Sequence, residues 1–145
     1  MHTRPMRWWD IAALHPVEEE LFGPTAWSPA QFWSELAQPN RTYRVAEDAE
    51  GIVGYAGLMS VPPTADVQTV AVSGGAQRRG IGRALLTELL DAARRTGCTE
   101  MLLEVHAVND AAVALYIVEG FEVIARRTDY YGAGVDALIM RRRPL

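Results

Sequence analysis

The feature that most constrains the fold is an apolar strand joined to an amphipathic helix by a glycine-rich turn. Asp66 to Val72 is predicted to be a strand, and it ends in the apolar run Val70-Ala71-Val72. After Ser73-Gly74-Gly75, a helix is predicted from about Gly80 to Arg95, because apolar residues recur there every three or four positions. A helix with one apolar stripe must bury that stripe against another layer. The segment therefore predicts an α/β fold.

The rest of the chain carries short helix and strand patterns without a linker or an internal repeat. Apolar residues from Arg7 to Leu14 follow helical spacing, and Pro16 is expected to interrupt that run. A second helix begins after Ser28, which can form a capping box with Gln31, and runs to about Ala37. The other predicted elements are strands at Tyr43–Ala46, Ile52–Ser60, Thr99–Val105, Phe121–Thr128 and Val135–Arg141, and a helix from Asn109 to about Glu119. This order predicts a single α/β domain over residues 1–145, built around one mixed sheet.

The residue counts exclude several chemistries. All 14 basic residues are Arg, so a Schiff-base lysine and a P-loop lysine are both excluded. The lone Cys98 excludes internal disulfides, and the three histidines are scattered, so no metal site is predicted. A net charge of -4 argues against nucleic acid as a direct partner. The longest uncharged run, Gly51 to Ala65, has 15 residues and is broken by Gly and Pro, so no membrane span is expected. We expect a cytoplasmic location.

The glycine turn has the composition of an anion-binding loop. Within Gln77-Arg-Arg-Gly-Ile-Gly82, two glycines let the backbone approach a ligand, and the first amides of the next helix have no partner inside it. Such a helix start attracts phosphate, and Arg78, Arg79 and Arg83 add positive charge. A dinucleotide-binding fingerprint would need a third glycine where Leu85 stands. The alternative interpretation is a tight strand-to-helix turn with solvated arginines.

These segments together resemble the GCN5-related N-acetyltransferase (GNAT) family. The stretch from Val70 to Leu86 is similar to the family's acyl-CoA-binding motif, and the later segments follow in the family's order: Leu103-Glu104-Val105, Asn109, Ala114-Leu115-Tyr116 and Glu119-Gly120-Phe121. The resemblance implies a central, mostly antiparallel sheet with one splayed pair of parallel strands, flanked by helices. It also implies acetyl-CoA binding without a metal, by Val70, Ala71, Val72, Gln77, Arg78, Arg79, Gly80, Ile81, Gly82, Arg83 and Asn109.

Within the family, the chain is most similar to the RimI branch, which acetylates the N-terminal alanine of a small-subunit ribosomal protein. The similar segments are Ala26-Trp27-Ser28, Leu102-Leu-Glu-Val105, and Arg126-Arg127 through Tyr130-Tyr131 to Asp136-Ala-Leu-Ile-Met140. The resemblance implies acetyl transfer to a protein N-terminal α-amine by direct attack in a ternary complex. A departure is His106, which stands where these relatives often carry Arg. The alternatives are an enzyme for a small-molecule amine and a CoA-binding regulatory module without turnover.

Two residues are predicted to move protons. Glu104 lies near the end of its strand, on the face opposite Leu103 and Val105, and the resemblance makes it the proton acceptor. Tyr116 follows Asn109 by two helical turns, so the two share one side of a helix. The resemblance places Tyr116 beside the CoA sulfur as the acid. From the pattern alone, the alternatives are a surface glutamate at a strand end, a packing tyrosine and an Asn109 that only caps the helix.

Three aromatic residues are predicted to bind the acceptor. In the relatives, the hairpin that carries Tyr130 and Tyr131 flanks the peptide N-terminus, and Trp27 comes from the opposite wall. The alternative is that all three pack against the protein itself. The acidic run Glu18-Glu19-Glu20 is predicted to be a solvated face, and the alternative is that it attracts a basic peptide end.

Overall fold

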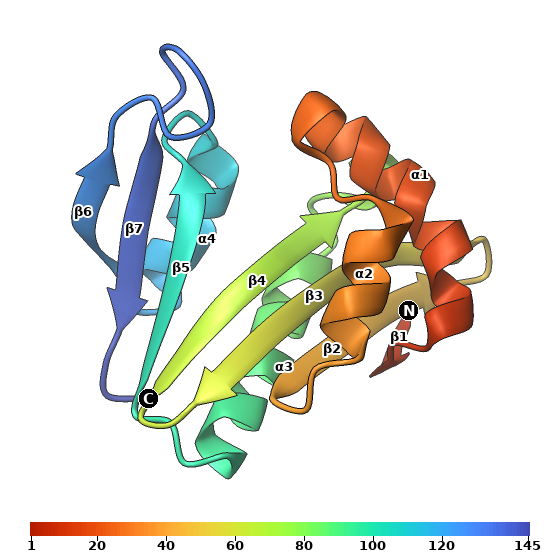
Figure 1. Ribbon diagram of the computed structural model, residues 1–145, viewed down its shortest axis with the longest axis horizontal. Coiled ribbons are helices and arrows are strands. Elements are labelled where there is room, and N and C mark those ends of the chain that lie inside the picture. Colours follow the sequence, from red (N-terminus) through yellow and green to blue (C-terminus); the bar gives the residue numbers. More distant parts are fainter.

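A computed structural model describes residues 1–145 as one seven-stranded sheet with α-helices on both faces (Figure 1). The strands are β1 (His2–Pro5), β2 (Arg41–Asp48), β3 (Gly51–Val61), β4 (Thr64–Val72), β5 (Glu100–His106), β6 (Glu122–Arg127) and β7 (Ala137–Arg142). The helices are α1 (Ile11–Phe22), α2 (Pro29–Leu36), α3 (Ile81–Arg95) and α4 (Asp110–Val118). The strands lie in the order β1-β2-β3-β4-β5-β7-β6, and only β4 and β5 pair in parallel. None of the helices is long and apolar enough to cross a membrane.

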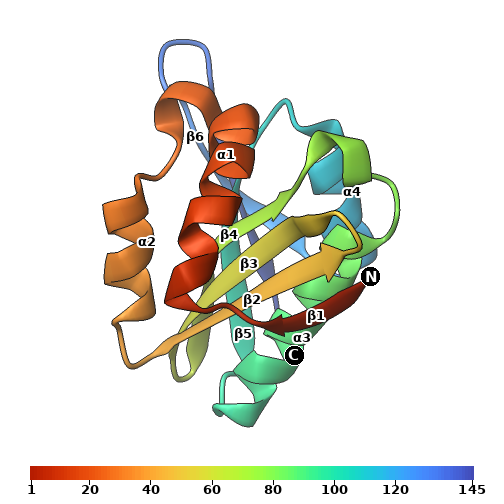
Figure 2. The ribbon, with the colours of Figure 1, turned by 90° about the vertical axis from the view of Figure 1, so that its right-hand side faces the viewer.

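The sheet separates two hydrophobic cores, and strand alternation decides which side chain enters which core. On β3, Tyr55 faces α1 and α2, whereas the next residue, Ala56, faces α3. Figure 2 shows α1 and α2 on one side of the sheet and α3 on the other. The apolar stripe predicted for α3 is buried as expected, with Leu85 and Leu89 fully covered. This packing confirms the α/β class and the mixed sheet with one parallel pair.

The predicted helix starts are confirmed by their caps. The Oγ of Ser28 accepts a hydrogen bond from the backbone N–H of Gln31 at 3.2 Å, and the Gln31 side chain accepts one from the Ser28 N–H at 2.7 Å. The Oδ1 of Asn109 accepts from the N–H of Ala112 at 3.2 Å, so Asn109 caps α4. Both signals are local, because a cap needs only residues three positions apart.

Two expectations for the first 22 residues are wrong. Residues His2–Pro5 form a strand that the sequence pattern did not predict, and this strand exists through its pairing with β2. Pro16 does not interrupt the first helix, which runs from Ile11 to Phe22. Pro16 has no backbone N–H, so the carbonyl of Ala12 lacks its helical hydrogen bond. Ala12 and Pro16 are both exposed, so water can donate a hydrogen bond to that oxygen.

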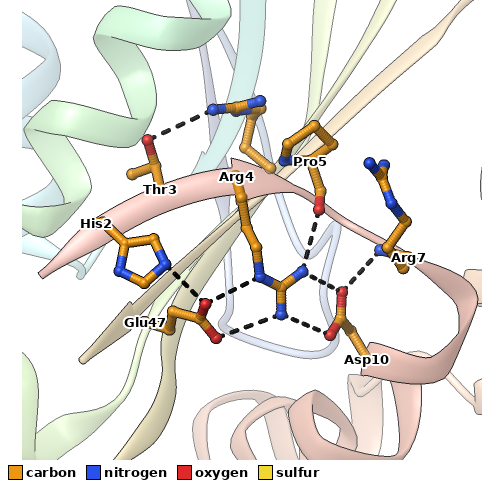
Figure 3. A network of polar contacts seen from close by, with 8 residues as sticks. His2, Thr3, Arg4, Pro5, Arg7, Asp10 and Glu47 are labelled. Carbon is orange, nitrogen blue, oxygen red and sulfur yellow. Dashed lines mark hydrogen bonds and ion pairs between the residues drawn. The ribbon is translucent and has the colours of Figure 1, made fainter. Parts of the chain in front are cut away.

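The strand β1 is tied to the start of α1 by an ionic network centred on Arg4 (Figure 3). The guanidinium of Arg4 donates to both carboxylate oxygens of Asp10, each at 2.8 Å, and to Glu47 at 3.0 Å. Asp10 also accepts from the backbone N–H of Arg7 at 2.7 Å and is only 4% exposed. The hydrogen bonds from Arg4 and Arg7 hold the pKa of Asp10 below its ordinary value.

Replacing Asp10 with Ala is expected to lower the free energy of unfolding by about 2–3 kcal/mol near neutral pH, because Arg4 loses its buried partner. Since folding lowers the pKa of Asp10, its contribution is complete above the unfolded-state pKa of about 3.9 and is lost as the pH falls below that value. Urea denaturation across this pH range measures both effects. The control is Asp91→Ala, which removes an exposed pair with Arg94 and should cost under about 0.5 kcal/mol. Equal losses for the two variants would contradict the prediction.

Candidate functional site

The site lies where β4 and β5 separate. These parallel strands pair only at their beginnings, from Thr64 opposite Glu100 to Asp66 opposite Leu102. Beyond these residues they diverge, and Figure 1 shows the open V between the two strand ends. The facing edges of the diverging parts are therefore not paired with each other. Backbone groups on these edges that have no other partner can bind a ligand.

A bulge in β4 lies at the start of this divergence. Thr69 is opposite Gly57 of β3, but Val67 is opposite the very next residue, Leu58, so Gln68 has no partner on β3. A bulge bends a strand and increases its local twist. This irregularity begins immediately after the last pair of β4 with β5, and it accounts for the change in direction of β4.

A cavity of about 210 Å³ occupies the region between the diverging strands. Its lining comes from β4, β5, α4, the α1–α2 region and the loop between β6 and β7: Val67, Gln68, Thr69, Val70, Glu104, Val105, His106, Asn109, Ala112, Tyr116, Glu18, Phe22, Thr25, Trp27 and Tyr131. The helices α1 and α4 lie on opposite faces of the sheet (Figure 2). The cavity is therefore lined from both faces, through the gap in the sheet.

Glu104 reaches this cavity from the exposed face of β5. Alternation along β5 buries Leu103 and Val105 in the core, and it leaves Glu104 exposed on the other face, as predicted. Its carboxylate lies 3.8 Å from the guanidinium of Arg127. Burial raises the pKa of neighbouring Asp66, and the negative charges of Glu100 and Glu104 raise it further. The region beside the divergence is thus rich in carboxylates.

Tyr116 reaches the cavity from α4. Its side chain is 7% exposed, and its ring packs edge-on against Phe121 with 5.8 Å between centroids. Burial raises the pKa of Tyr116 to about 12, with a smaller contribution from Tyr131. No protein group hydrogen-bonds to its hydroxyl, which is therefore available to a ligand as a protonated donor.

The two tyrosines of the β6–β7 loop differ in their surroundings. Tyr131 lines the cavity and stacks on His106 of β5, with 3.8 Å between ring centroids and an interplanar angle of 12°. Burial raises the pKa of Tyr131 to about 12, and the charge of Glu104 contributes. Tyr130 does not line the cavity: it is 46% exposed, and the guanidinium of Arg127 lies over its ring at 5.0 Å. The stack with His106 thus fixes Tyr131, and not Tyr130, at the cavity.

The glycine turn before α3 presents a row of free amides. None of the backbone N–H groups from Arg78 to Arg83 donates to a backbone carbonyl. Arg78 and Gly80 both have positive φ, of 66° and 77°. For a non-glycine residue such as Arg78, this conformation costs about 1–2 kcal/mol. Unpaired amides, a helix N-terminus and the guanidinium of Arg78 form a donor set that fits a phosphate group. The guanidinium groups of Arg79 and Arg83 pair with Asp48 and Glu119.

The α1–α2 region forms the wall that carries Trp27, and it corrects the prediction for Glu18. Glu18 is not part of a solvated face: it is 3% exposed and lines the cavity. Its carboxylate accepts a hydrogen bond from the hydroxyl of Tyr55 at 2.6 Å and one from the backbone N–H of Trp27 at 3.0 Å. Only Glu19 and Glu20 of the acidic run are exposed.

The structure brings six of the predicted site residues to the one cavity: Val70, Glu104, Asn109, Tyr116, Trp27 and Tyr131. The predicted cofactor residues from Gln77 to Arg83 lie at the turn before α3, outside the lining. Ala71 and Ile81 bury their side chains in the two cores, so only their backbones can bind a ligand. No group of three or more His, Cys, Asp or Glu side chains is placed to hold a metal ion.

Sequence reasoning missed Glu18, Phe22 and Thr25 as cavity residues. A signal for Glu18 was present, because it follows Leu14 by four residues and Ile11 by seven, which is the spacing of the buried face of α1. The run of three glutamates nevertheless predicts a solvated face, because charged side chains are rarely buried.

Comparison with known proteins identifies relatives over most of the chain. The model of the acetyltransferase (GNAT) family matches residues 8–121. The chain is 45% identical to the N-alpha-acetyltransferase RimI of Mycobacterium tuberculosis over 132 residues, covering 87% of this chain and 82% of the relative. It is 31% identical to the ribosomal protein bS18-alanine N-acetyltransferase of Escherichia coli K12, covering 90% and 89%. The crystal structure of the E. coli ribosomal-protein-S18-alanine N-acetyltransferase superposes with a TM-score of 0.88 at 29% identity, covering 99% and 93%.

Proposed function

The chain belongs to the GNAT acetyltransferase family and is an acyltransferase, and we propose that it transfers the acetyl group of acetyl-CoA to the N-terminal α-amine of a protein. The names of the RimI relatives support N-terminal acetylation. The finer proposal is that the acceptor is the N-terminal alanine of a small-subunit ribosomal protein. It is supported by the likeness to the E. coli bS18-alanine enzyme over 90% of this chain.

The observation that carries the proposal is the pairing of a carboxylate and a free phenol in one cavity. Glu104 and Tyr116 come from β5 and α4, and both line the cavity between the diverging strands. A carboxylate accepts a proton and a tyrosine with a raised pKa donates one. Acetyl transfer to an amine needs both events, one at the nitrogen and one at the leaving sulfur.

The turn before α3 and the open edge of β4 fit the two parts of acetyl-CoA. The unpaired amides from Arg78 to Arg83 would hold its phosphates, and Val70 to Val72 would present backbone groups to its amide-containing arm. Gln77 would support this turn, since its side chain donates to the carbonyl of Val72 at 3.2 Å. Asn109 lines the cavity beside Tyr116, so its cap of α4 and a cofactor contact are compatible.

Each proton has a defined path in the proposed reaction. Bound acetyl-CoA supplies the acetyl group as a thioester. Glu104 takes a proton from the cationic α-amine, which frees the lone pair that attacks the acetyl carbon, and passes this proton to solvent. The nitrogen releases its second proton to solvent as the amide forms. Tyr116 gives its proton to the sulfur as the carbon–sulfur bond breaks, and it regains a proton from solvent. Cys98, the only thiol, is buried in the core away from the cavity, which supports direct attack without an acetyl-cysteine intermediate.

The lining of the cavity is suited to an amine acceptor. Its acidic residues are Glu18 and Glu104, and no Arg lines it. A free α-amine has a pKa of about 7.7–8.0, so it reaches the site largely as a cation that the exposed carboxylate of Glu104 attracts. Trp27 and Tyr131 lie on the lining as the two aromatic contacts for the first residues of a peptide.

Incubation with acetyl-CoA and a peptide that begins Ala-Arg and has an internal Lys is expected to place one acetyl group on the α-amine only. The Lys amine has a pKa of about 10.4 and is almost fully protonated at neutral pH, so it attacks poorly. Fragmentation mass spectrometry locates the acetyl group. A copy of the peptide with a blocked N-terminus is the control and should remain unmodified.

The remaining outcomes separate the alternatives. Acetylation of metabolite amines with no transfer to either peptide would contradict the proposal in favour of a small-molecule acceptor. Binding of acetyl-CoA without transfer to any amine would favour a regulatory module.

The ribosomal substrate is tested by exchanging the first residue of the peptide: a peptide that begins with Ala is expected to react faster than one that begins with Leu or Met. Equal rates for all three would contradict the finer proposal.

A further inference from the structure

Glu18 is a buried carboxylate for which neither helix packing nor the proposed chemistry accounts. It is 3% exposed, and the positions before it on the same face of α1 are the apolar Ile11 and Leu14. An apolar residue at this position would extend that face without the cost of removing a carboxylate from water. No basic side chain forms an ion pair with Glu18; its two partners are neutral donors.

Those two donors connect Glu18 to the wall of the cavity. The Oε2 atom accepts from the backbone N–H of Trp27, immediately before Ser28, the cap of α2. The Oε1 atom accepts from the hydroxyl of Tyr55 on β3, in the core of the sheet. Glu18 therefore joins the backbone of the α1–α2 loop to a fixed point on the central sheet.

A chain of aromatic contacts also connects Trp27 to Tyr55. The ring of Trp27 packs against Phe32 with 5.2 Å between centroids, and Phe32 packs edge-on against Tyr55 at 5.9 Å. Phe32 and Tyr55 are fully buried. The circuit Glu18–Trp27–Phe32–Tyr55 holds the backbone of Trp27 through Glu18 and its ring through Phe32. Of these four residues, Glu18 and Trp27 also line the cavity.

We propose that Glu18 is a positioning residue for the acceptor: its carboxylate fixes Trp27 and with it the wall against which the acceptor peptide binds. The inference rests on the proposed function, because it takes the cavity lined by Trp27 as the place where the peptide enters. Glu18 acts through its hydrogen bonds with Trp27 and Tyr55. Its replacement is therefore expected to affect binding of the acceptor and not binding of acetyl-CoA. The turn that would hold the phosphates of acetyl-CoA lies at the start of α3, on the other face of the sheet from α1.

The test variant is Glu18→Met, which fills a similar volume but cannot accept either hydrogen bond. Without the link to Glu18, the α1–α2 loop is expected to become mobile, and the KM for the Ala-Arg peptide is expected to rise about 10-fold. The expected change in kcat is under about 3-fold, and the Kd of acetyl-CoA should be unchanged. Fluorescence titration with acetyl-CoA and steady-state kinetics measure these quantities.

Glu18→Gln is the rescue variant. The Gln oxygen can accept from the N–H of Trp27, and the Gln amide can donate to the oxygen of Tyr55, so both links remain without the charge. Its peptide KM is expected to stay within about 3-fold of the wild type. Glu19→Ala is the matched control, because Glu19 lies on the same helix with a 63% exposed side chain outside the cavity; wild-type kinetics are expected.

A second measurement does not depend on turnover. In the wild type, the amide hydrogen of Trp27 is bonded to a buried acceptor, so its exchange with solvent should be slow. Exchange followed by NMR is expected to become at least about 10-fold faster in Glu18→Met and to remain slow in Glu18→Gln. If Glu18→Met does not fold, Tyr55→Phe is the second variant, since it removes the anchor of Glu18 and should raise the peptide KM by a smaller factor.

The failures of the two proposals are distinguishable. A wild-type enzyme that acetylates no peptide N-terminus overturns the proposed function and the inference together. An active wild type with an unchanged peptide KM in Glu18→Met overturns the inference alone. A Glu18→Gln variant as impaired as Glu18→Met also overturns it, because the charge and not the hydrogen-bond geometry would then be responsible.

Discussion

Replacing Glu104 with Gln is expected to lower kcat for peptide acetylation about 100-fold near neutral pH, which is within the usual contribution of a general base. Gln has nearly the same shape but cannot take a proton from the attacking amine. The KM for acetyl-CoA should change little, because Glu104 lies on the face of β5 opposite the core that contains α3. Steady-state kinetics at saturating peptide measure the effect. Glu100→Gln is the control: Glu100 is on the same face of β5 but does not line the cavity, so its kcat should stay near the wild-type value.

The pH dependence of the Glu104→Gln variant has a defined sign. The fraction of peptide amine that is already deprotonated rises through its pKa of about 7.7–8.0, so the variant should gain activity as the pH rises. The deficit relative to the wild type is expected to narrow to about 10-fold near pH 9. A kcat equal to that of the wild type near neutral pH would remove Glu104 from the reaction.

Replacing Tyr116 with Phe is expected to lower kcat by a similar factor of about 100, because the leaving sulfur loses its proton donor. The hydroxyl of Tyr116 forms no hydrogen bond within the protein, and its ring contact with Phe121 is kept by Phe. The free energy of unfolding should therefore change by under about 1 kcal/mol. Thermal denaturation and the Kd of acetyl-CoA check that the variant is folded and binds. An unchanged kcat in the Glu104→Gln, Tyr116→Phe double variant would contradict both assignments.

The raised pKa of Tyr116 defines the pH range in which its hydroxyl can act as the proposed acid. A pKa of about 12 keeps the hydroxyl protonated, and the donor is lost only as the pH approaches that value. Ionisation of Tyr116 should therefore cause no decrease in wild-type kcat up to about pH 10. A decrease in wild-type kcat near pH 8 that is absent from the Tyr116→Phe variant would contradict the raised pKa of Tyr116.

The α1–α2 region contains one prediction that the structure confirms and two that it contradicts. The capping box predicted for Ser28 and Gln31 is present. Trp27 lines the cavity, and its contact with the acceptor stays a prediction. The run of three glutamates predicts a solvated face for Glu18, because charged side chains are rarely buried, and the structure contradicts this prediction. The interruption predicted at Pro16 is also wrong. The penalty for Pro16 is small here, since the carbonyl it leaves unpaired faces water, and exposure is a property that only the folded chain defines.

The sequence pattern also did not predict β1, because this strand depends on contacts with distant residues. His-Thr-Arg-Pro has neither alternation nor β-branched residues beyond Thr3, so no local pattern marks it as a strand. It forms because it pairs antiparallel with β2 and because its Arg4 forms ion pairs with Asp10 and Glu47. The Arg4–Glu47 contact joins residues 43 positions apart, a distance at which sequence periodicity carries no information.

The sequence by itself determined the local elements: the stripe of α3, the caps at Ser28 and Asn109, and the turn of free amides before α3. Each depends on residues within about one or two helical turns, so propensity and spacing suffice. The resemblance implies a splayed parallel pair and a site that contains Glu104 and Tyr116. Only the tertiary structure shows that β4 leaves β5 after Asp66 and that Glu18 lines the resulting cavity with them. Lateral strand pairing and burial depend on contacts between distant segments. The sequence therefore predicts which residues could do the chemistry, and the folded chain decides how they lie relative to one another.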